Sequence, residues 1–347
     1  MNPSTSRVFS LRVRVAATLA GRPVGIMGWA WRLALAWPFL VLYRFGIAAR
    51  DLGFRVGLYR QHRVDRLTIS VGNLSAGGTG KTPAVALLAK TFESRLGSRR
   101  QRVLILSRGY GGAIQPGESK GSALKNDEAQ VLHDLVPRAL HVQQRDRVAA
   151  ARTALQADEE IGVILLDDGF SHRRLYRDVD LVLVDASRPL GDAELLPRGL
   201  MREPLRALRR ASAVLLTRAD QVSSQRLVRV VRKLRRAMPP SVPLAVAIHE
   251  AQGLIDLDTR ESVALASLSG VRVLVACAIG NPESLVRSVE ACAADVVKTL
   301  VWPDHHSFTV DDVARIEQEA ERSHVQAIVV THKDAVKFDR LRVSRAL

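Results

Sequence analysis

The residues of this 347-residue chain whose types and spacing most clearly indicate chemistry lie in one stretch, residues 72–83. It reads Gly-Asn-Leu-Ser-Ala-Gly-Gly-Thr-Gly-Lys-Thr-Pro, close to the phosphate-binding pattern G-x-x-x-x-G-K-[ST], with Ser75 replacing the first glycine. Glycines let consecutive backbone N–H groups face phosphate oxygens, and a following helix adds the positive end of its dipole. The stretch therefore predicts a nucleotide phosphate site. Its predicted binding residues are Ser75, Ala76, Gly77, Gly78, Thr79, Gly80, Lys81 and Thr82.

Two of these side chains can act on the phosphates directly. Lys81 is expected to reach the β and γ phosphates, and the Thr82 hydroxyl to ligate Mg²⁺. An acidic partner for the metal is expected at the end of an apolar strand, and the run Gly-Val-Ile-Leu-Leu-Asp-Asp-Gly supplies Asp167 and Asp168. Asp185, which ends another apolar run, competes with them, and a strand-end aspartate can also cap the next helix or turn. We expect Thr82, Asp167 and Asp168 to hold the metal.

The elements that must position these residues follow a regular order. Short runs rich in Val, Ile or Leu alternate with helical stretches, the pattern of βαβ units. The phosphate-binding stretch falls between the first strand and the first helix. The predicted strands are Leu67–Val71, Val103–Ser107, Ile161–Leu166, Asp180–Val184, Ala213–Thr217 and Leu244–Ala247, and the predicted helices are Thr82–Arg95, Asp127–Leu135, Arg145–Gln156 and Ser224–Ala237.

A second series of elements begins near residue 250. The fold class is therefore α/β, with a P-loop NTPase-like α/β/α domain over residues 66–250 and a smaller α/β domain over residues 251–347. The second series comprises a possible hairpin of Gly253–Leu257 and Ser262–Ala266, strands at Val271–Ala276, Val296–Val301 and Ala327–Thr331, and helices after Pro282 and from Asp311.

Composition narrows the classes of protein that are compatible with this chain. Hydrophobic residues make up 47% and charged residues 25%, as in a soluble globular protein. Two cysteines are too few for a disulfide scaffold or a structural zinc site. The net charge is +16, of which +9 lies in residues 1–66, where eleven arginines meet only Asp51 and Asp65. Such an excess indicates an anionic partner, either nucleic acid or a membrane surface.

The N-terminal region favours the membrane. The uncharged run Leu33–Tyr43 would span only about 16 Å as a helix, against about 30 Å for a hydrocarbon core. Trp29, Trp31 and Trp37 lie in the same region among arginines, a composition suited to lipid headgroups. We predict an interfacial membrane helix over residues 29–65 after an extension over residues 1–28. A helix packed on its own domain and a true span or signal anchor are the alternatives.

Several motifs resemble, in the same order, those of the tetraacyldisaccharide 4′-kinase family, the lipid A 4′-kinases. The resemblance runs from about residue 29 to about residue 340. Three positions depart from the family's usual residues: Asn126 for Gly, Ser171 for Gln and His332 for Glu. The resembling stretches are 72–83, Arg108-Gly-Tyr-Gly-Gly112, Asp127-Glu-Ala129, Asp167-Asp-Gly-Phe-Ser-His172, Leu196-Pro-Arg-Gly-Leu-Met-Arg-Glu-Pro204, Ile279-Gly-Asn-Pro282, Asp304-His-His-Ser-Phe308 and Thr331-His-Lys-Asp-Ala-Val-Lys337.

The resemblance implies an activity. It is the phosphorylation, by ATP with Mg²⁺, of the 4′-hydroxyl of a lipid A disaccharide 1-phosphate at the cytoplasmic face of the inner membrane. The enzyme would be a phosphotransferase acting on a sugar hydroxyl, with its two α/β domains joined by a β-stranded hinge. Its partners would be the lipid substrate and the anionic membrane surface, with no nucleic acid.

The resemblance also indicates which residues handle the proton. Asp127 stands where the family has its base, and it would accept or orient the 4′-hydroxyl proton, although an aspartate at a helix start is also a favoured N-cap. His305 resembles the histidine that pairs with this aspartate; a metal site or a plain loop are its alternatives. Arg202 and Glu203 could meet the nucleotide or metal, or form a surface ion pair. The predicted catalytic residues are thus Asp127, His305 and Lys81.

A different class of function is compatible with the phosphate-binding stretch alone. A basic P-loop NTPase could act on nucleic acid or as a switch, and residues 216–220, Leu-Thr-Arg-Ala-Asp, are similar to a GTPase base-reading loop. Against this reading, the basic excess is arginine mixed with tryptophan and leucine and not a separate hydrophilic stripe.

Overall fold

The computed structural model describes residues 36–96, 101–109, 113–114, 127–188, 194–304 and 306–345. The extension 1–28, Trp29, Trp31 and His305 lie outside the described residues, as does the side chain of Asp127. Contacts divide the chain into two compact units. The first unit comprises residues up to Lys81 together with Asp146–Ala247, and the second comprises Thr82–Arg145 and residues from Ile248 onwards. The domain ranges 66–250 and 251–347 stay predictions.

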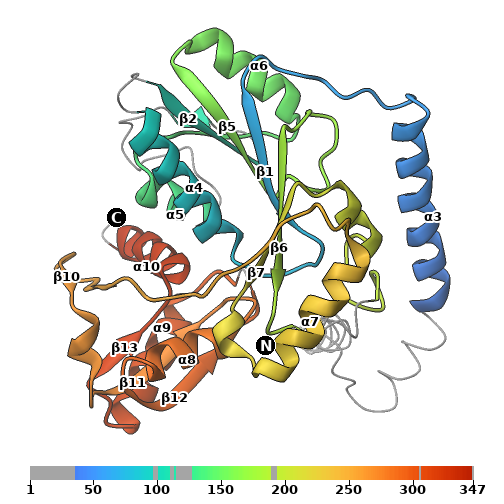
Figure 1. Ribbon diagram of the computed structural model, residues 1–347. Coiled ribbons are helices and arrows are strands. Elements are labelled where there is room, and N and C mark those ends of the chain that lie inside the picture. Colours follow the sequence, from blue (N-terminus) through green and yellow to red (C-terminus); the bar gives the residue numbers. More distant parts are fainter. Residues whose placement is uncertain are drawn as a thin grey trace, which may run out of the picture. The chain divides into compact units, whose positions relative to one another are not determined.

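The first unit is built on five parallel strands in the order β5-β1-β6-β7-β8 (Figure 1). Because all five run in one direction, their carboxyl ends meet at one edge, where ligands of open α/β sheets bind. Strand β1 is central and lies between β5 and β6. The bounds are β1 Leu67–Asn73, β5 Ile161–Asp167, β6 Val179–Asp185, β7 Ala213–Thr217 and β8 Leu244–Val246.

Helices bury the apolar faces of this sheet. Helix α6 (Arg147–Ala157) begins at Asp146, whose carboxylate caps two backbone N–H groups. Helix α7 (Ser224–Ala237) is capped by Ser223 and packs Val230 and Leu234 into the core with side chains of β6 and β7. Two short 3₁₀ helices, η4 (Leu205–Arg210) and η5 (Ala219–Gln221), complete the unit with helix α3.

Helix α3 (Ala36–Arg55) confirms a helix within the predicted membrane segment. It ends earlier than the predicted segment, because Gly57 takes a φ of 77° two residues after Arg55, a conformation that stops helices. Leu40 and Ile47 are buried, whereas most apolar side chains on the other faces are exposed. Among the described residues, no helix combines the length and apolar character needed to cross a bilayer.

One part of the second unit consists of helices α4 (Lys81–Leu96) and α5 (Asp127–Leu135) and the strands β2, β3 and β4. Strand β4 (Leu140–Gln143) pairs in parallel with β2 (Arg102–Ser107). It also pairs antiparallel with the short β3 (Ala113–Ile114). Strands β3 and β4 were not predicted from the sequence. In β4, the polar His141 and Gln143 are buried, so the strand lacks the apolar pattern used to find the others.

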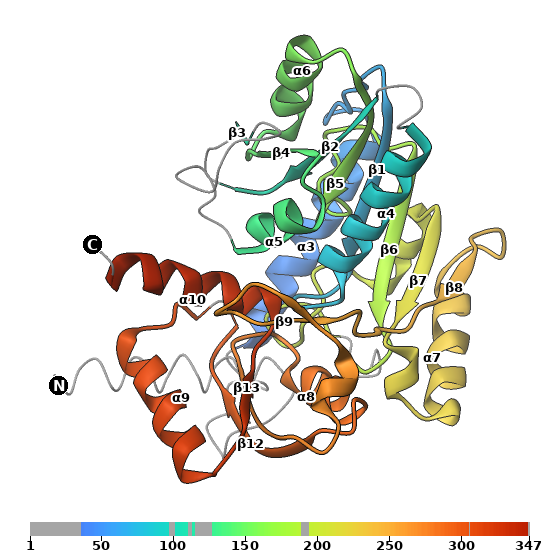
Figure 2. The ribbon, with the colours of Figure 1, turned by 90° about the vertical axis from the view of Figure 1, so that its left-hand side faces the viewer.

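The remainder of the second unit is a three-stranded parallel sheet in the order β12-β11-β13, with helices around it (Figure 2). Its core holds Leu274, Trp302, Phe308 and Ile316. Helix α10 packs against α5. The bounds are β9 Leu254–Ile255, β10 Ser262–Val263, η6 Leu265–Leu268, β11 Arg272–Cys277, α8 Pro282–Glu290, β12 Asp295–Val301, α9 Val310–Arg322, β13 Ala327–Val329 and α10 His332–Arg345. Antiparallel β9 and β10 confirm the predicted hairpin.

Candidate active site

The predicted phosphate-binding residues form the loop that joins β1 to α4. Strand β1 ends at Asn73 and the helix begins at Lys81, as the sequence pattern predicted. Gly77 and Gly80 take φ values of 101° and 87°, which side chains rarely adopt, so these two positions require glycine. A Cβ on Gly77 would lie 2.9 Å from Arg188 Nη1, which places that guanidinium beside the loop.

Asn73 fixes the start of this loop. Its side-chain amide donates 2.7 Å to the backbone oxygen of Ser75 and 2.9 Å to the hydroxyl of Thr79. The backbone N–H of Ala76 donates 2.7 Å to the oxygen of Leu200. These bonds tie the first half of the loop to the end of β1 and to the segment around Leu200.

A cluster of charged side chains lies beside the loop. Lys81 Nζ lies 3.9 Å from Asp168 Oδ1. Arg202 donates hydrogen bonds of 2.8 Å to both oxygens of the same carboxylate, and also donates to the side-chain oxygen of Asn73. Burial alone would raise the pKa of Asp168, but the hydrogen bonds and charge of Arg202, with Lys81 and Arg147, hold it below its usual value. Asp168 is therefore ionised at neutral pH, between two cations.

The two adjacent aspartates differ in their surroundings. Asp167 is the last residue of β5 and is only 5% exposed. Asp168 takes a φ of 52°, which turns the chain out of the strand, and 34% of its side chain is exposed. The buried Arg147 donates 3.2 Å to the backbone oxygen of Asp168 and so supports this turn. Asp168 is thus the member of the pair that reaches the loop lysine.

The competing candidate, Asp185, is engaged by the protein itself. It is the last residue of β6, and its carboxylate accepts 2.8 Å from the backbone N–H and 2.6 Å from the hydroxyl of Ser187. It also accepts from Arg218. Its side chain is 2% exposed. These contacts favour a structural role for Asp185 and leave Asp168 as the reachable acid.

Arg202 and Glu203 connect this cluster to α3. Arg202 accepts a hydrogen bond of 2.9 Å from the Tyr43 hydroxyl on its backbone oxygen. Glu203 is buried and pairs with Arg50 at 3.0 Å and with Arg210 at 2.8 Å. The surface ion pair considered for Glu203 is therefore wrong, because the side chain lies inside the unit. The segment that holds Asp168 also anchors the helix predicted to meet the membrane.

The predicted proton-handling residues belong to the second unit. Asp127 is the first residue of α5. Lys333, on α10, lies 3.5 Å from Glu128 and 3.2 Å from Asp304, the residues next to Asp127 and His305 in the chain. The lysine thus brings together the segments that carry the two predicted residues. Thr82, predicted as a metal ligand, is the second residue of α4 and is half-buried.

Three residues of the loop cluster were missed as site residues. Asn73 lies within the phosphate-binding stretch but was given no role there. Arg147 and Arg188 come from distant parts of the chain, through contacts that no motif spacing encodes. The one available signal was position, since Asn73 directly ends an apolar strand. Arg202 was considered, but its partner Asp168 was not foreseen, because 34 residues separate them.

A parallel α/β sheet with a glycine-rich loop, a loop lysine and a strand-end acid defines a P-loop phosphotransferase. Comparison with known proteins gives the family. Residues 32–347 match the model of the tetraacyldisaccharide-1-P 4′-kinase family. The chain belongs to this family, and it is a kinase for a sugar hydroxyl of a lipid A precursor, as its motifs predicted.

Individual relatives agree with this assignment. The tetraacyldisaccharide 4′-kinase of Anaeromyxobacter dehalogenans (strain 2CP-C) is 37% identical over 347 residues, covering 93% of this chain and 87% of the relative. That of Syntrophus aciditrophicus is 38% identical over 316 residues, covering 86% and 83%. The crystal structure of LpxK from Aquifex aeolicus in complex with ATP superposes with a TM-score of 0.65 at 28% identity, covering 88% of this chain and 90% of that one. These comparisons confirm the predicted fold class and the lipid kinase assignment. They favour that assignment over the alternative, a basic P-loop NTPase that acts on nucleic acid or as a switch.

Proposed function

We propose that the loop of residues 75–82 holds the triphosphate of ATP and that Lys81 stabilises the transferring γ-phosphoryl group. The observation that carries this proposal is the cluster of Lys81, Asp168 and Arg202 beside a loop with two left-handed glycines. The loop N–H groups and the Lys81 ammonium face charge that spreads over the phosphoryl oxygens during transfer. Arg188 adds a further cation over Gly77.

The residues present fit Mg²⁺. This ion prefers oxygen ligands, and Asp168 offers a partly exposed, ionised carboxylate beside the loop, with the Thr82 hydroxyl next to Lys81 in the chain. Asp167 is more deeply buried, and we assign it as a further metal ligand behind Asp168. When bound there, Mg²⁺ would neutralise negative charge on the phosphates. Arg202 orients the Asp168 carboxylate for this role, and its guanidinium would add a cation beside the phosphates.

Asp127 and His305 complete the reaction. The 4′-hydroxyl oxygen of the disaccharide attacks the γ-phosphorus, the bond from phosphorus to the β–γ bridging oxygen breaks, and ADP leaves. Asp127 takes the hydroxyl proton, and His305 pairs with Asp127 and holds this proton or passes it on. The Lys333 bridge between Glu128 and Asp304 supports this pairing, because it holds together the segments on either side.

Turnover assays test these roles. Lys81→Ala is expected to lower kcat by about 10³-fold, since its contact acts mainly in the transition state. Asp127→Ala and His305→Ala should lower kcat more than they change KM for ATP, and their losses should be strongly non-additive. The assay follows transfer from γ-labelled ATP to a tetraacyl disaccharide 1-phosphate in detergent micelles. Wild-type-like kcat in folded Lys81→Ala, or a double mutant with the full product of both losses, contradicts the assignment.

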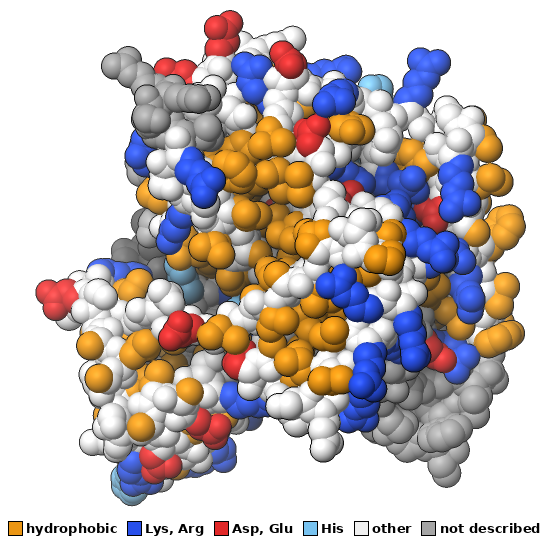
Figure 3. All heavy atoms as spheres, viewed as in Figure 1, with side chains coloured by type: hydrophobic (Ala, Val, Ile, Leu, Met, Phe, Trp, Pro, Cys, Tyr) orange, Lys and Arg blue, Asp and Glu red, His pale blue; other side chains and the backbone are white. Residues whose placement is uncertain are grey.

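Helix α3 lies on the anionic surface of the inner membrane, at its cytoplasmic face, where ATP is available. Its exposed side chains include Trp37, Phe39, Leu42 and Phe45, and they gather along the edge of the unit beside basic side chains (Figure 3). An exposed apolar stripe of this kind suits the boundary between headgroups and acyl chains. Arginines on the same helix add attraction to anionic lipid, and no nucleic-acid partner is required.

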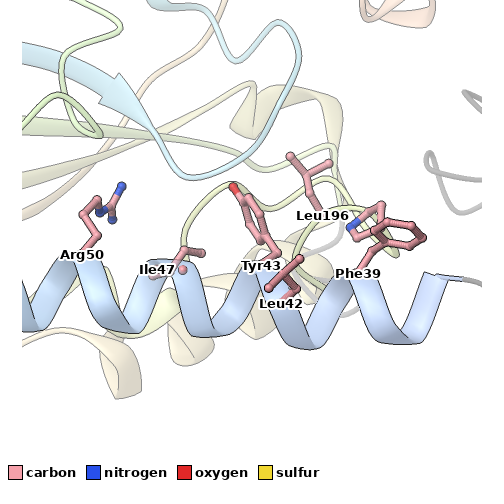
Figure 4. Close-up of a pocket in the computed structure, with 8 residues that line it drawn as sticks. Phe39, Leu42, Tyr43, Ile47, Arg50 and Leu196 are labelled. Carbon is pink, nitrogen blue, oxygen red and sulfur yellow. The ribbon is translucent and has the colours of Figure 1, made fainter.

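A groove beside α3 suits an acyl chain of the substrate. It has a volume of about 730 Å³ and is lined by apolar side chains, with Arg50 among them. Phe39 and Tyr43 reach from the helix toward Leu196 (Figure 4). Because Tyr43 also bonds to the backbone of Arg202, the groove lies next to the segment that holds Asp168. A lipid held there keeps its sugar near the phosphate site.

Vesicle co-sedimentation tests the membrane assignment. Leu42→Glu should weaken binding to anionic vesicles, while Leu87→Glu, which adds the same charge, serves as the matched control, since Leu42 and Leu87 are both 67% exposed. Binding of the wild type should weaken with salt without vanishing, because the apolar part is not screened. Equal sedimentation of the α3 variant and the Leu87→Glu control would contradict the assignment. The nucleotide site should stay intact in both.

A further inference from the structure

The phosphate-binding loop rests on two side chains that follow β7. The buried Arg218 donates 2.8 Å from Nη1 to the backbone oxygen of Gly78. The buried Thr217 donates 3.0 Å from its hydroxyl to the backbone oxygen of Thr79. When loop N–H groups face a phosphate, the carbonyls of the same peptides point away and need partners of their own. These two donors supply them at consecutive residues.

We call Thr217 and Arg218 the brace of the loop. Other residues hold the brace in place. Arg218 pairs with the carboxylate of Asp185, which Ser187 also holds. Asp185 and Thr217 stand opposite each other in the register of β6 and β7, and the N–H of Ala186 donates 2.9 Å to the Thr217 oxygen. The guanidinium therefore joins the ends of two strands to the loop.

The backbone of Arg218 supports the same reading. Its φ of 54° and ψ of 38° are left-handed, which is unfavourable for any residue with a Cβ. Such a conformation persists where the surroundings fix it, and it often marks a functional site. Here the turn carries the arginine from the sheet edge to the Gly78 carbonyl.

We propose that Thr217 and Arg218 are positioning residues for ATP, which hold the carbonyls of Thr79 and Gly78 so that the loop N–H groups converge on the triphosphate. Neither side chain touches the nucleotide. This proposal rests on the proposed function of the phosphate loop, and it adds the two side chains that hold the loop carbonyls. It assigns a role to the Thr-Arg dipeptide that had suggested a base-reading loop.

The test measures ATP affinity by titration calorimetry and KM for both substrates. Arg218→Lys keeps the charge beside Asp185, but its side chain ends one atom short of Nη1, the nitrogen that donates to both Asp185 and Gly78. Thr217→Val keeps the shape without the hydroxyl. Each should raise the dissociation constant for ATP by about 3- to 10-fold, the value of one lost hydrogen bond. KM for the lipid should stay within twofold of wild type. Thr217→Ser, which keeps the hydroxyl, should restore ATP affinity.

Two matched controls separate positioning from general stability. Ser212 Oγ accepts 2.9 Å from the N–H of Asp180 at the other end of the same strands, and Arg66 Nε donates 2.7 Å to the oxygen of Ile161. Ser212→Ala and Arg66→Lys remove comparable bonds away from the loop and should leave ATP affinity unchanged.

Three outcomes would overturn the proposal. They are wild-type ATP affinity in folded Arg218→Lys and Thr217→Val, equal weakening in the controls, or an equal rise in KM for the lipid. Failure of the phosphate loop itself would show differently, as full turnover in Lys81→Ala. An inactive Lys81→Ala enzyme with normal ATP binding in both brace variants would refute the brace alone.

Discussion

Two aspartates lie at the ends of the strands on either side of β1, and their carboxylates have opposite roles. Asp168 follows β5 on one side, has 34% of its side chain exposed, and meets Lys81 and Arg202. Asp185 ends β6 on the other side, is 2% exposed, and meets Arg218 and Ser187. Both follow apolar strands, so their sequence contexts are alike. Their partners make the difference.

The comparison shows what separates a site residue from a structural one at a sheet edge. The partners named for Asp185 are Ser187 and Arg218, and Arg218 in turn donates to the backbone oxygen of Gly78. This carboxylate therefore helps to fix the loop. Asp168 leaves its strand through a left-handed turn and reaches the front, where its partners are cations that can also bind phosphate. An acid at a strand end serves chemistry only when the backbone turns it toward the ligand.

Among the substitutions that test this contrast, Asp168→Asn should have the largest effect on kcat. The amide keeps the shape but loses the charge that holds a metal and orients Arg202, so kcat should fall by about 10²- to 10³-fold. The melting temperature should change little, because the side chain is partly exposed. Steady-state kinetics across a Mg²⁺ titration, with thermal denaturation alongside, measure both quantities. A variant that keeps wild-type kcat would remove Asp168 from the site.

Asp185→Asn should act on stability first. It leaves Arg218 buried without its counter-charge, a change that costs about 3–5 kcal/mol in comparable buried pairs. Chemical denaturation gives the free energy of unfolding, and kcat at saturating ATP should fall less than in Asp168→Asn. If Asp185→Asn instead stayed stable and lost kcat as strongly as Asp168→Asn, the two acids would not differ in role.

Arg202→Met should alter the pH dependence of activity. With Arg202 present, the pKa of Asp168 lies below its ordinary value, so the carboxylate is retained as pH falls through that value. Without Arg202, Lys81 and Arg147 remain, but the strongest group that lowers the pKa against burial is lost, so the pKa of Asp168 rises. The acid limb of the kcat/KM profile should therefore move to higher pH, and activity at pH 5 should fall more than at pH 8. An unmoved acid limb would show that Arg202 does not control this carboxylate.

Much of this arrangement could be predicted from the sequence. Periodicity located the strands β1, β5, β6 and β7, and the glycine pattern located the loop, because both depend on neighbours in the chain. The choice among Asp167, Asp168 and Asp185 depends on one backbone turn and on distant arginines, which local patterns do not contain. Strand β4 was missed because His141 is buried through a hydrogen bond of 2.9 Å with Ser107, a contact between residues 34 positions apart.

Ser187→Ala should produce the smallest effect and gives the finest test of the contrast. The Ser187 hydroxyl donates 2.6 Å to Asp185, while the backbone N–H of the same residue donates 2.8 Å and survives the substitution. The carboxylate also keeps Arg218. Loss of one hydrogen bond among three partners should cost about 1 kcal/mol of unfolding free energy. Because the brace remains, kcat and ATP affinity should stay within twofold of wild type, with Ser212→Ala as the matched hydroxyl deletion at the other end of the strands. A loss of ATP affinity in Ser187→Ala without a loss of stability would mean that Asp185 acts on the nucleotide more directly than its burial indicates.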